Sequence, residues 1–466
     1  MRRGIEIFMI RNDKLSEECA VFGVSLRSDE AVGVTYNGLV ALQHRGQEGA
    51  GIAVVKDQRI FCHKAAGLVT EVFSGDVLEN LPHGSVAVGH TSYSTSGNRR
   101  PENIGPFVTE YFTGRIATAH NGAITNADEI RKQLYDSGVR FKATSDSEVI
   151  SSLIVHHTLD NSNTVKGSIA AAKELRGAFS LVIATGKNRL IAIRDANGFR
   201  PLCLGESELG VAVASESCAL ESCGFNFVRD ILPGEVIVVE NGEVNSKGVL
   251  LTEKVPNRGL CIFEYVYFAR PDSIIDGLSV YDARRKAGAI LAEEHPVEAD
   301  LVCGVPDSGL EAAYGYSQKS GITLGSALVR NRYIGRSFIY PTQAQRDAAV
   351  RLKLNVLAAS IKGKRIVLVD DSLVRGTTTA KIIRNLKAAG AAEVHMRFAS
   401  PPLKYVCGYG TDLDAQENLI ANKMDLDKIC RQIGADSLGY ISMNGLVRAC
   451  GNSARSFCTA CFMGHQ

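Results

Sequence analysis

One stretch decides the fold of the C-terminal half: Val367-Leu368-Val369-Asp370-Asp371-Ser372-Leu373-Val374-Arg375-Gly376-Thr377-Thr378. The apolar run 365–369 predicts a buried strand, and 377–386 predicts a helix. A loop that leaves a parallel strand and opens a helix offers free backbone N–H groups and the positive helix end to a phosphate. Gly376 lets the backbone approach a phosphate closely. The stretch is not a Walker loop, because the lysine of that loop is missing. The stretch therefore predicts a phosphate-binding loop of another kind.

Asp370 and Asp371 would by themselves repel a bound phosphate. Their position makes sense if they hold Mg²⁺ or ribose hydroxyls beside it; the competing interpretation is a polar turn with an acidic helix cap. The segment 330–353 adds basic side chains that suit a lid closing on pyrophosphate, or else form a solvated surface. These residues are Arg330, Arg332, Arg336, Arg346, Arg351 and Lys353.

The bulk composition is that of a globular protein of two to four domains. The chain has 466 residues, of which 45% are hydrophobic and 22% charged. A formal net charge of +2 gives no overall attraction to nucleic acid or acidic membranes. Neither a membrane span nor a secretory signal is visible, so a cytoplasmic protein is expected. Disulfides are rare there, so most of the twelve cysteines are expected in the core.

The pattern of apolar and polar residues changes near residue 280. Before it, short apolar runs alternate with Gly- and Asn-rich turns, which predicts many strands, with helices near 32–44 and 145–159. After it, strands alternate with Ala/Lys/Arg-rich helices, the signature of a doubly wound parallel sheet. The strands expected in this half are 300–304, 322–329, 365–369 and 394–399, and helical patterns resume beyond 412.

Cys19 opens the apolar run 20–24 after a polar stretch of eighteen residues. A cysteine at the start of a strand is most often a buried structural residue. If residues 1–18 were cleaved, however, Cys19 would carry both a thiol and a free α-amine. That amine could serve as the base for the thiol, which makes Cys19 a candidate nucleophile.

The loop resembles the signature of type I phosphoribosyltransferases, and its details are most similar to the glutamine phosphoribosylpyrophosphate amidotransferase family. Other segments resemble the same family: 42–52, 119–122, 194–195, 198–202, 304–309, 331–336 and 351–355. The resemblance implies an N-terminal-nucleophile glutaminase domain, an αββα sandwich, followed by a type I phosphoribosyltransferase domain with a doubly wound parallel sheet. The expected division is a propeptide at 1–18, the glutaminase domain at 19–255, the transferase domain at 256–411, and a C-terminal helical segment at 412–466.

By this resemblance each domain carries its own site. Cys19 attacks the glutamine amide, and Asn121 with the backbone N–H of Gly122 forms the oxyanion hole. The glutamine itself is held by Arg45, Thr95 and Asp146. In the other domain Ser308, Asp370 and Asp371 lie at Mg²⁺. The residues that bind phosphoribosyl pyrophosphate are Asp370, Asp371, Ser372, Arg375, Gly376, Thr377, Thr378, Arg332 and Lys353.

Two positions depart from the family pattern. The family usually has a His-x-Arg-Tyr segment whose arginine clamps the α-carboxylate of glutamine, whereas this chain has Ser92 in His90-Thr91-Ser92-Tyr93. A hydroxyl does not replace a bidentate guanidinium contact. The glycine common after the nucleophile is replaced by Ala20. One alternative is therefore a paralogue with an impaired glutaminase site that uses free ammonia.

Four cysteines stand out by their context: Cys261, Cys407, Cys458 and Cys461. Four thiolates suit either zinc or an iron–sulfur cluster, and chemistry alone does not separate the two. Family members that have a propeptide carry a [4Fe–4S] cluster on cysteines in these contexts, so the resemblance implies that cluster. It would act as a clamp between the domain junction, the transferase domain and the C-terminal tail.

The resemblance implies an enzyme that converts phosphoribosyl pyrophosphate, glutamine and water to 5-phosphoribosylamine, glutamate and pyrophosphate, the first committed step of purine biosynthesis. It also implies Mg²⁺, inhibition by purine nucleotides and a homotetramer, with no nucleic-acid or membrane partner. A remote alternative is a non-catalytic sensor of phosphoribosyl pyrophosphate. Such a regulator should have a basic DNA-binding module, and none is visible in this near-neutral sequence.

Overall fold

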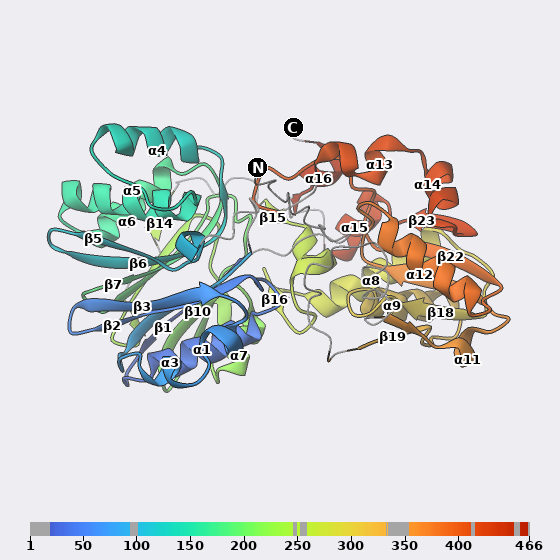
Figure 1. Cartoon of the computed structure of the whole chain (residues 1–466), viewed down its shortest axis with the longest axis horizontal. Coiled ribbons are helices and arrows are strands. Elements are labelled where there is room, and N and C mark those ends of the chain that lie inside the picture. The colour runs from blue at the N-terminus through green and yellow to red at the C-terminus, as the bar shows by residue number, and fades with distance from the viewer. Residues whose placement is uncertain are drawn as a thin grey trace, which may run out of the picture.

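The structure is a computed structural model that describes residues 19–93, 101–245, 249–251, 259–331, 333, 354–411, 415–451 and 457–464. Figure 1 shows two bodies side by side. The N-terminal half, coloured blue to green, contains two stacked sheets. The C-terminal half, coloured yellow to red, contains a smaller sheet with helices around it. None of the helices within the described ranges has the length and apolar character that a membrane crossing requires.

The two sheets of the N-terminal half are antiparallel and pack face to face. Their facing sides bury apolar residues such as Val21, Val88 and Val182, none of which is accessible to solvent. The first sheet has the order β11-β9-β10-β1-β4-β2-β3, and the second has β13-β12-β8-β7-β6-β5 with β14 beside β12. The strands are β1 (Ala20–Leu26), β2 (Gly49–Lys56), β3 (Arg59–Ala66), β4 (Val86–Ser92), β5 (Phe107–Tyr111), β6 (Gly114–Ile124), β7 (Gly177–Thr185), β8 (Arg189–Arg194), β9 (Cys203–Ser207), β10 (Gly210–Ala214), β11 (Asn226–Asp230), β12 (Glu235–Glu240), β13 (Glu243–Val244) and β14 (Val249–Leu250).

Helices cover the outer faces of both sheets. Central strands such as β7 are therefore buried on both sides and apolar almost throughout. The first sheet is covered by α1 (Ala31–Ala41), α2 (Val69–Val72), α3 (Asp76–Glu79) and α7 (Ser217–Ser222). The second is covered by α4 (Ala127–Asp136), α5 (Asp146–Asn161) and α6 (Thr164–Glu174). The expected αββα sandwich is confirmed, and so are the helices expected near 32–44 and 145–159.

The C-terminal half contains a parallel sheet in the order β18-β21-β22-β23. Helices α8, α9 and α15 bury one face, and α11, α12 and α14 bury the other, as in doubly wound folds. The elements are β18 (Leu301–Gly304), β21 (Arg365–Asp370), β22 (Glu393–Phe398), β23 (Ser437–Tyr440), α8 (Val280–Glu294), α9 (Leu310–Ser320), α11 (Ala358–Ile361), α12 (Thr377–Ala388), α13 (Ile420–Lys423), α14 (Leu426–Ile433), α15 (Met443–Ala449) and α16 (Ala460–Met463).

Two expectations for this half are corrected. The run 322–329 is not a full strand of the main sheet. It makes one isolated parallel bridge, from Leu324 to Val302 of β18, and only its end forms a strand, β19 (Leu328–Arg330), antiparallel to β20 (Leu354–Val356). Gly325 interrupts the apolar run after the bridge. The C-terminal segment is not purely helical, since it supplies β23. That strand covers the edge of β22, which would otherwise expose unpaired backbone groups, and the Phe398 and Tyr440 rings stack there at 5.1 Å.

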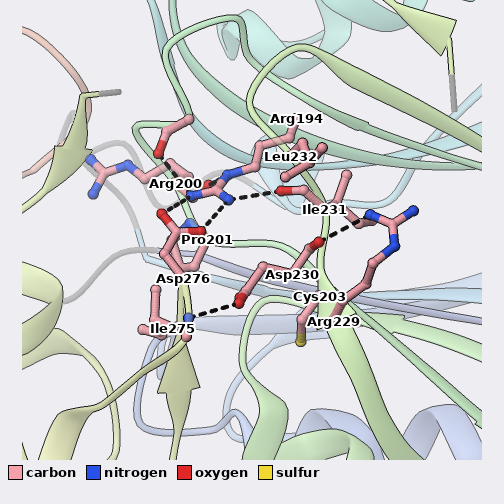
Figure 2. Close-up of polar contacts among 12 residues, drawn as sticks. Arg194, Arg200, Pro201, Cys203, Arg229, Asp230, Ile231, Leu232, Ile275 and Asp276 are labelled. Carbon is pink, nitrogen blue, oxygen red and sulfur yellow. Dashed lines mark hydrogen bonds and ion pairs between the residues drawn. The ribbon is translucent and has the colours of Figure 1, made fainter. Parts of the chain in front are cut away.

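A short segment joins the two halves. It contains β15 (Leu260–Cys261), the π-helical turn η2 (Glu264–Phe268) and the hairpin β16 (Ile274–Ile275) and β17 (Leu278–Ser279). The buried Arg194 of β8 donates to both carboxylate oxygens of Asp276 in the hairpin turn, at 2.8 and 3.2 Å. Asp230 of β11 accepts from the Gly277 backbone N–H at 3.1 Å. Figure 2 shows this cluster, which binds the hairpin to the sandwich.

Candidate active sites

Cys19 lies half-buried immediately before β1. Its Sγ is 3.8 Å from the backbone oxygen of Tyr93. The register pairs Ala20 with Thr91, so its continuation places Cys19 opposite Ser92 at the end of β4. Because side chains alternate along a strand, Cys19 shares with Val21 the face that looks into the space between the two sheets.

Asn121 of β6 faces the same space from the other sheet, in alternation with the inward-facing Ala119. It is fully buried, and neither its amide nitrogen nor its amide oxygen has a hydrogen-bond partner among the described residues. A buried amide without partners is costly in a folded protein. The neighbouring Gly122 has φ +135°, and a Cβ there would lie 2.1 Å from the Ala178 oxygen, so only glycine fits. Both features suit an oxyanion hole.

Asp146, the first residue of α5, lies at the end of the same strand. Its Oδ2 accepts from the Ile124 backbone N–H at 3.1 Å, and its Oδ1 is 3.8 Å from Nδ1 of His120. The His120 ring is buried and also lies 3.0 Å from the Ser147 hydroxyl. Burial lowers the pKa of His120, although Asp146 opposes that effect. The carboxylate is thus fixed between β6 and α5 while part of its surface stays accessible.

His90 and Ser92 form a second polar pair beside Cys19. The Ser92 hydroxyl lies 3.0 Å from Nδ1 of His90, and Nε2 of His90 lies 2.8 Å from the His120 backbone oxygen. His90 is enclosed, and burial lowers its pKa to about 4. The imidazole is therefore neutral at physiological pH. This pair was missed from the sequence, where Ser92 marks only the loss of an arginine.

Arg45 is fully buried at the junction between the halves. It forms ion pairs with Glu216, which follows β10, and with Glu264 of η2. Burial alone would raise the pKa of Glu216, but Arg45 and His44 together hold it well below its usual range. A contact of Arg45 with glutamine stays a prediction, and Thr95 lies outside the described residues. Glu264 was also missed, although a charged residue inside the apolar run 262–268 signals a buried ion pair.

The candidate transferase site lies at the carboxyl ends of β18 and β21. Ser308 donates to Asp371, and the Asp371 backbone N–H donates to Oδ1 of Asp370 at 3.0 Å. Both carboxylates are almost fully buried, at 3% and 1% exposure. Gly376 precedes α12 with φ +83°, which lets the loop turn directly into the helix. The structure thus gathers the expected loop and magnesium residues.

The other transferase residues follow along this loop. Ser372 is buried and donates to Asp371, while Thr377 is exposed in the first turn of α12. Arg375 and Thr378 are partly exposed beside it. A helix start of this kind attracts phosphate through its N–H groups and dipole. Arg332 and Lys353, expected in the lid, lie outside the described residues.

The four candidate cluster cysteines come together from three segments. Cys261 and Cys458 are paired residues of β15 and β24 (Phe457–Cys458), and the Cys461 oxygen accepts from the Tyr405 backbone N–H, two residues before Cys407. Burial raises the pKa of Cys461, and Cys407 and Cys458 add to that rise. Within the described ranges, no three His, Cys, Asp or Glu side chains are arranged to hold a metal ion.

Comparisons with known proteins match both domains. A glutamine amidotransferase domain model matches residues 92–222, and a phosphoribosyl transferase domain model matches residues 273–398. The amidophosphoribosyltransferase of Methanocaldococcus jannaschii is 46% identical, over 96% of this chain and 97% of that protein. The chain belongs to the amidophosphoribosyltransferase family.

Other members of this family give the same result. The Bacillus subtilis amidophosphoribosyltransferase is 42% identical, over 97% of this chain and 94% of that protein. A solved structure of glutamine phosphoribosylpyrophosphate amidotransferase from B. subtilis, in complex with ADP and GMP, has a TM-score of 0.88 and 41% identity. The structural match covers 96% of this chain and 97% of the chain in the B. subtilis structure. The expected fold class, the phosphoribosyltransferase activity and the place in purine biosynthesis are confirmed.

Proposed function

We propose that this amidophosphoribosyltransferase uses glutamine as its nitrogen donor, through Cys19. The main support is the buried amide of Asn121, which has no hydrogen-bond partner among the described residues and faces the same inter-sheet space as Cys19. Cys19 Sγ bonds to the amide carbon of glutamine, the C–N bond breaks, and the thiol proton leaves with the nitrogen as ammonia. Asn121 and Gly122 stabilise the oxyanion of that step. Water then cleaves the thioester, which releases glutamate and restores the thiol.

The second half-reaction takes place at the phosphate loop. Ammonia bonds to C1 of the ribose, the bond from C1 to the pyrophosphate oxygen breaks, and the new nitrogen loses one proton to the departing pyrophosphate or water. Residues 375–378 hold the 5′-phosphate meanwhile. Adjacent buried carboxylates and a hydroxyl fit Mg²⁺, which takes oxygen ligands, so Ser308, Asp370 and Asp371 are proposed to hold it. When bound, the ion would neutralise charge on the leaving pyrophosphate.

The cysteine quartet is proposed to hold a [4Fe–4S] cluster. Thiolates are the ligands of such a cluster, and the four cysteines lie on three segments with Cys261 and Cys458 in register, although the described side chains form no group arranged to hold a metal ion. A cluster bound there would tie the junction to the C-terminal tail and has no role in either half-reaction. Iron and sulfide analysis of the purified protein, against zinc analysis, tests this assignment.

Purine nucleotides are proposed as inhibitors, and a homotetramer as the assembly. The B. subtilis structure bound to ADP and GMP supports the first of these for this chain. The proposed homotetramer rests on the family resemblance alone. Titration of activity with these nucleotides and sedimentation of the purified protein test the two proposals separately.

Steady-state rates with glutamine and with ammonium test the proposed donor. We expect turnover with both donors, and loss of only the glutamine activity in Cys19→Ala. Asp371→Asn should abolish both activities, because both need the phosphoribosyl site. Ammonium-only activity of the unaltered protein would instead establish the ammonia-using paralogue. N-terminal sequencing shows in the same preparation whether Cys19 carries the α-amine.

A further inference from the structure

The residue opposite the nucleophile is Ser92. The hydrogen bond from the Leu26 N–H to the Ser85 oxygen marks a hydrogen-bonded pair in the β1–β4 register. Hydrogen-bonded pairs recur at every second residue along an antiparallel ladder, so Cys19 and Ser92 form a non-hydrogen-bonded pair. In these pairs the side chains lie closest, with Cα atoms about 4.5 Å apart. Ser92 is 8% exposed, so its hydroxyl faces the nucleophile rather than bulk water.

The direction of the Ser92 hydroxyl follows from His90. Nε2 of His90 faces the backbone oxygen of His120, which can only accept, so this nitrogen carries the hydrogen. In a neutral imidazole the other nitrogen, Nδ1, is then an acceptor. The Ser92 hydroxyl must therefore donate its only proton to Nδ1. The Ser92 oxygen then has no further hydrogen to donate, and it can only accept a hydrogen bond from a group in the space in front of Cys19.

We propose that Ser92 binds the carboxamide nitrogen of glutamine, as a hydrogen-bond acceptor, and does not bind the α-carboxylate. This inference rests on the proposed use of glutamine at Cys19. A carboxylate is an acceptor and would face the Ser92 lone pairs unfavourably, whereas an amide N–H or a departing ammonia is a donor that fits them. Ser92 thus takes a new role at the position where the family has its carboxylate clamp.

The binding contact also has a consequence for which substrates Cys19 cleaves. With the amide oxygen at Asn121 and Gly122 and the amide nitrogen at Ser92, both polar ends of the carboxamide are recognised. A γ-ester of glutamate keeps the oxygen, the α-carboxylate and the α-amine but has no N–H for Ser92. Ser92 should therefore discriminate between glutamine and this ester, whereas a carboxylate contact would serve both equally.

The test compares kcat/KM for the release of glutamate from glutamine and from glutamate γ-methyl ester in Ser92→Ala; glutamine also yields ammonia, and the ester yields methanol. We expect a loss of roughly 3- to 10-fold with glutamine, the size of one neutral hydrogen bond, and no loss with the ester. Ser92→Thr keeps the hydroxyl and should restore the preference for glutamine. Ser92→Arg should lower glutamine use further, because the guanidinium offers only donors.

Thr91→Val is the matched control, since Thr91 is the buried neighbour on the opposite face of the strand and should leave the ratio of the two kcat/KM values unchanged. An equal loss with glutamine and with the ester in Ser92→Ala would place Ser92 on the α-carboxylate or on Cys19 and overturn the inference alone. A gain of glutamine activity in Ser92→Arg would overturn it too. If the unaltered protein used ammonium but cleaved neither glutamine nor the ester, the proposed function would fail, and this inference with it.

Discussion

At the scale of single residues, the glutaminase site contains buried polar atoms that find no hydrogen-bond partner in the part of the chain that the structure describes. The clearest case is the Asn121 amide, which is buried and unpartnered among the described residues. We predict that Asn121→Ala lowers kcat with glutamine by about 10²- to 10³-fold, the usual effect of losing one oxyanion donor. Ammonium-dependent synthesis should be unchanged, because that reaction does not use the oxyanion hole. A parallel fall in the ammonium rate would mean that Asn121 supports the fold instead.

His90 should leave a signature in the pH dependence of stability. Burial lowers its pKa from 6.5 to about 4, so below pH 6.5 the unfolded chain binds a proton that the folded chain does not. The contribution of the neutral ring is complete above pH 6.5 and is lost as the pH falls toward 4, by up to about 3 kcal/mol. Melting temperatures measured between pH 4 and 7 should therefore fall less steeply with acid in His90→Asn. Equal slopes in both proteins would contradict a buried neutral ring and the Ser92 orientation derived from it.

At the scale of elements, the transferase site depends on how closely α8 and α9 approach. A Cβ on Gly288 of α8 would lie 1.8 Å from the Ala312 oxygen, and one on Gly315 of α9 would lie 1.9 Å from the Arg285 oxygen. Two glycines therefore permit backbone contact between the helices. Because α9 begins just after Ser308, this contact also places a residue proposed for Mg²⁺.

We predict that Gly288→Ala destabilises the protein by about 1–3 kcal/mol, the cost of forcing extra volume into a packed interior. It should also raise the KM for phosphoribosyl pyrophosphate, since α9 must shift. Gly33→Ala is the control: Gly33 is exposed inside α1 with nothing within 4 Å of a Cβ. That change should raise stability by about 0.5–1 kcal/mol through helix propensity. Thermal unfolding of both variants checks the pair, and a neutral Gly288→Ala would refute the close contact.

At the scale of the whole molecule, the two halves are joined through buried charge. Arg194 pairs with Asp276 across the junction, and Asp230 lies beside that pair (Figure 2). Burial raises the pKa of Asp230 to about 6, and the charge of Asp276 adds to the rise while Arg194 opposes it. The protonated carboxyl favours the folded state, so this contribution is lost as the pH rises through 6.

Asp230→Asn should therefore stabilise the protein above pH 6, by up to about 3 kcal/mol. The amide oxygen can still accept from the Gly277 N–H, so the hairpin should stay in place. We expect the difference in melting temperature between the variant and the unaltered protein to grow between about pH 4 and 6 and to change little above that. A difference that does not change with pH would show that Asp230 ionises normally.

The parts of the molecule whose physics is local could be predicted from the amino-acid sequence. The apolar run, the acidic pair and Gly376 in one stretch of twelve residues suffice for a strand, a turn and a phosphate-binding helix start. Alternating strands and helices predicted the doubly wound sheet, and the family motifs predicted the sandwich. Other features could not be predicted, because they depend on partners far away in the chain that meet only in the folded protein. Arg45 meets Glu216 and Glu264, which are 171 and 219 residues distant.

The same distinction applies to β23 and to Ser92. The strand forms because the edge of β22 needs a partner, which local propensity cannot show. The role of Ser92 depends on which nitrogen of His90 carries the hydrogen, and that is set by a backbone oxygen of another sheet. A sequence shows that an arginine has been replaced by serine. Only the packing of two sheets, which fixes the direction of a single proton, shows what that serine can bind.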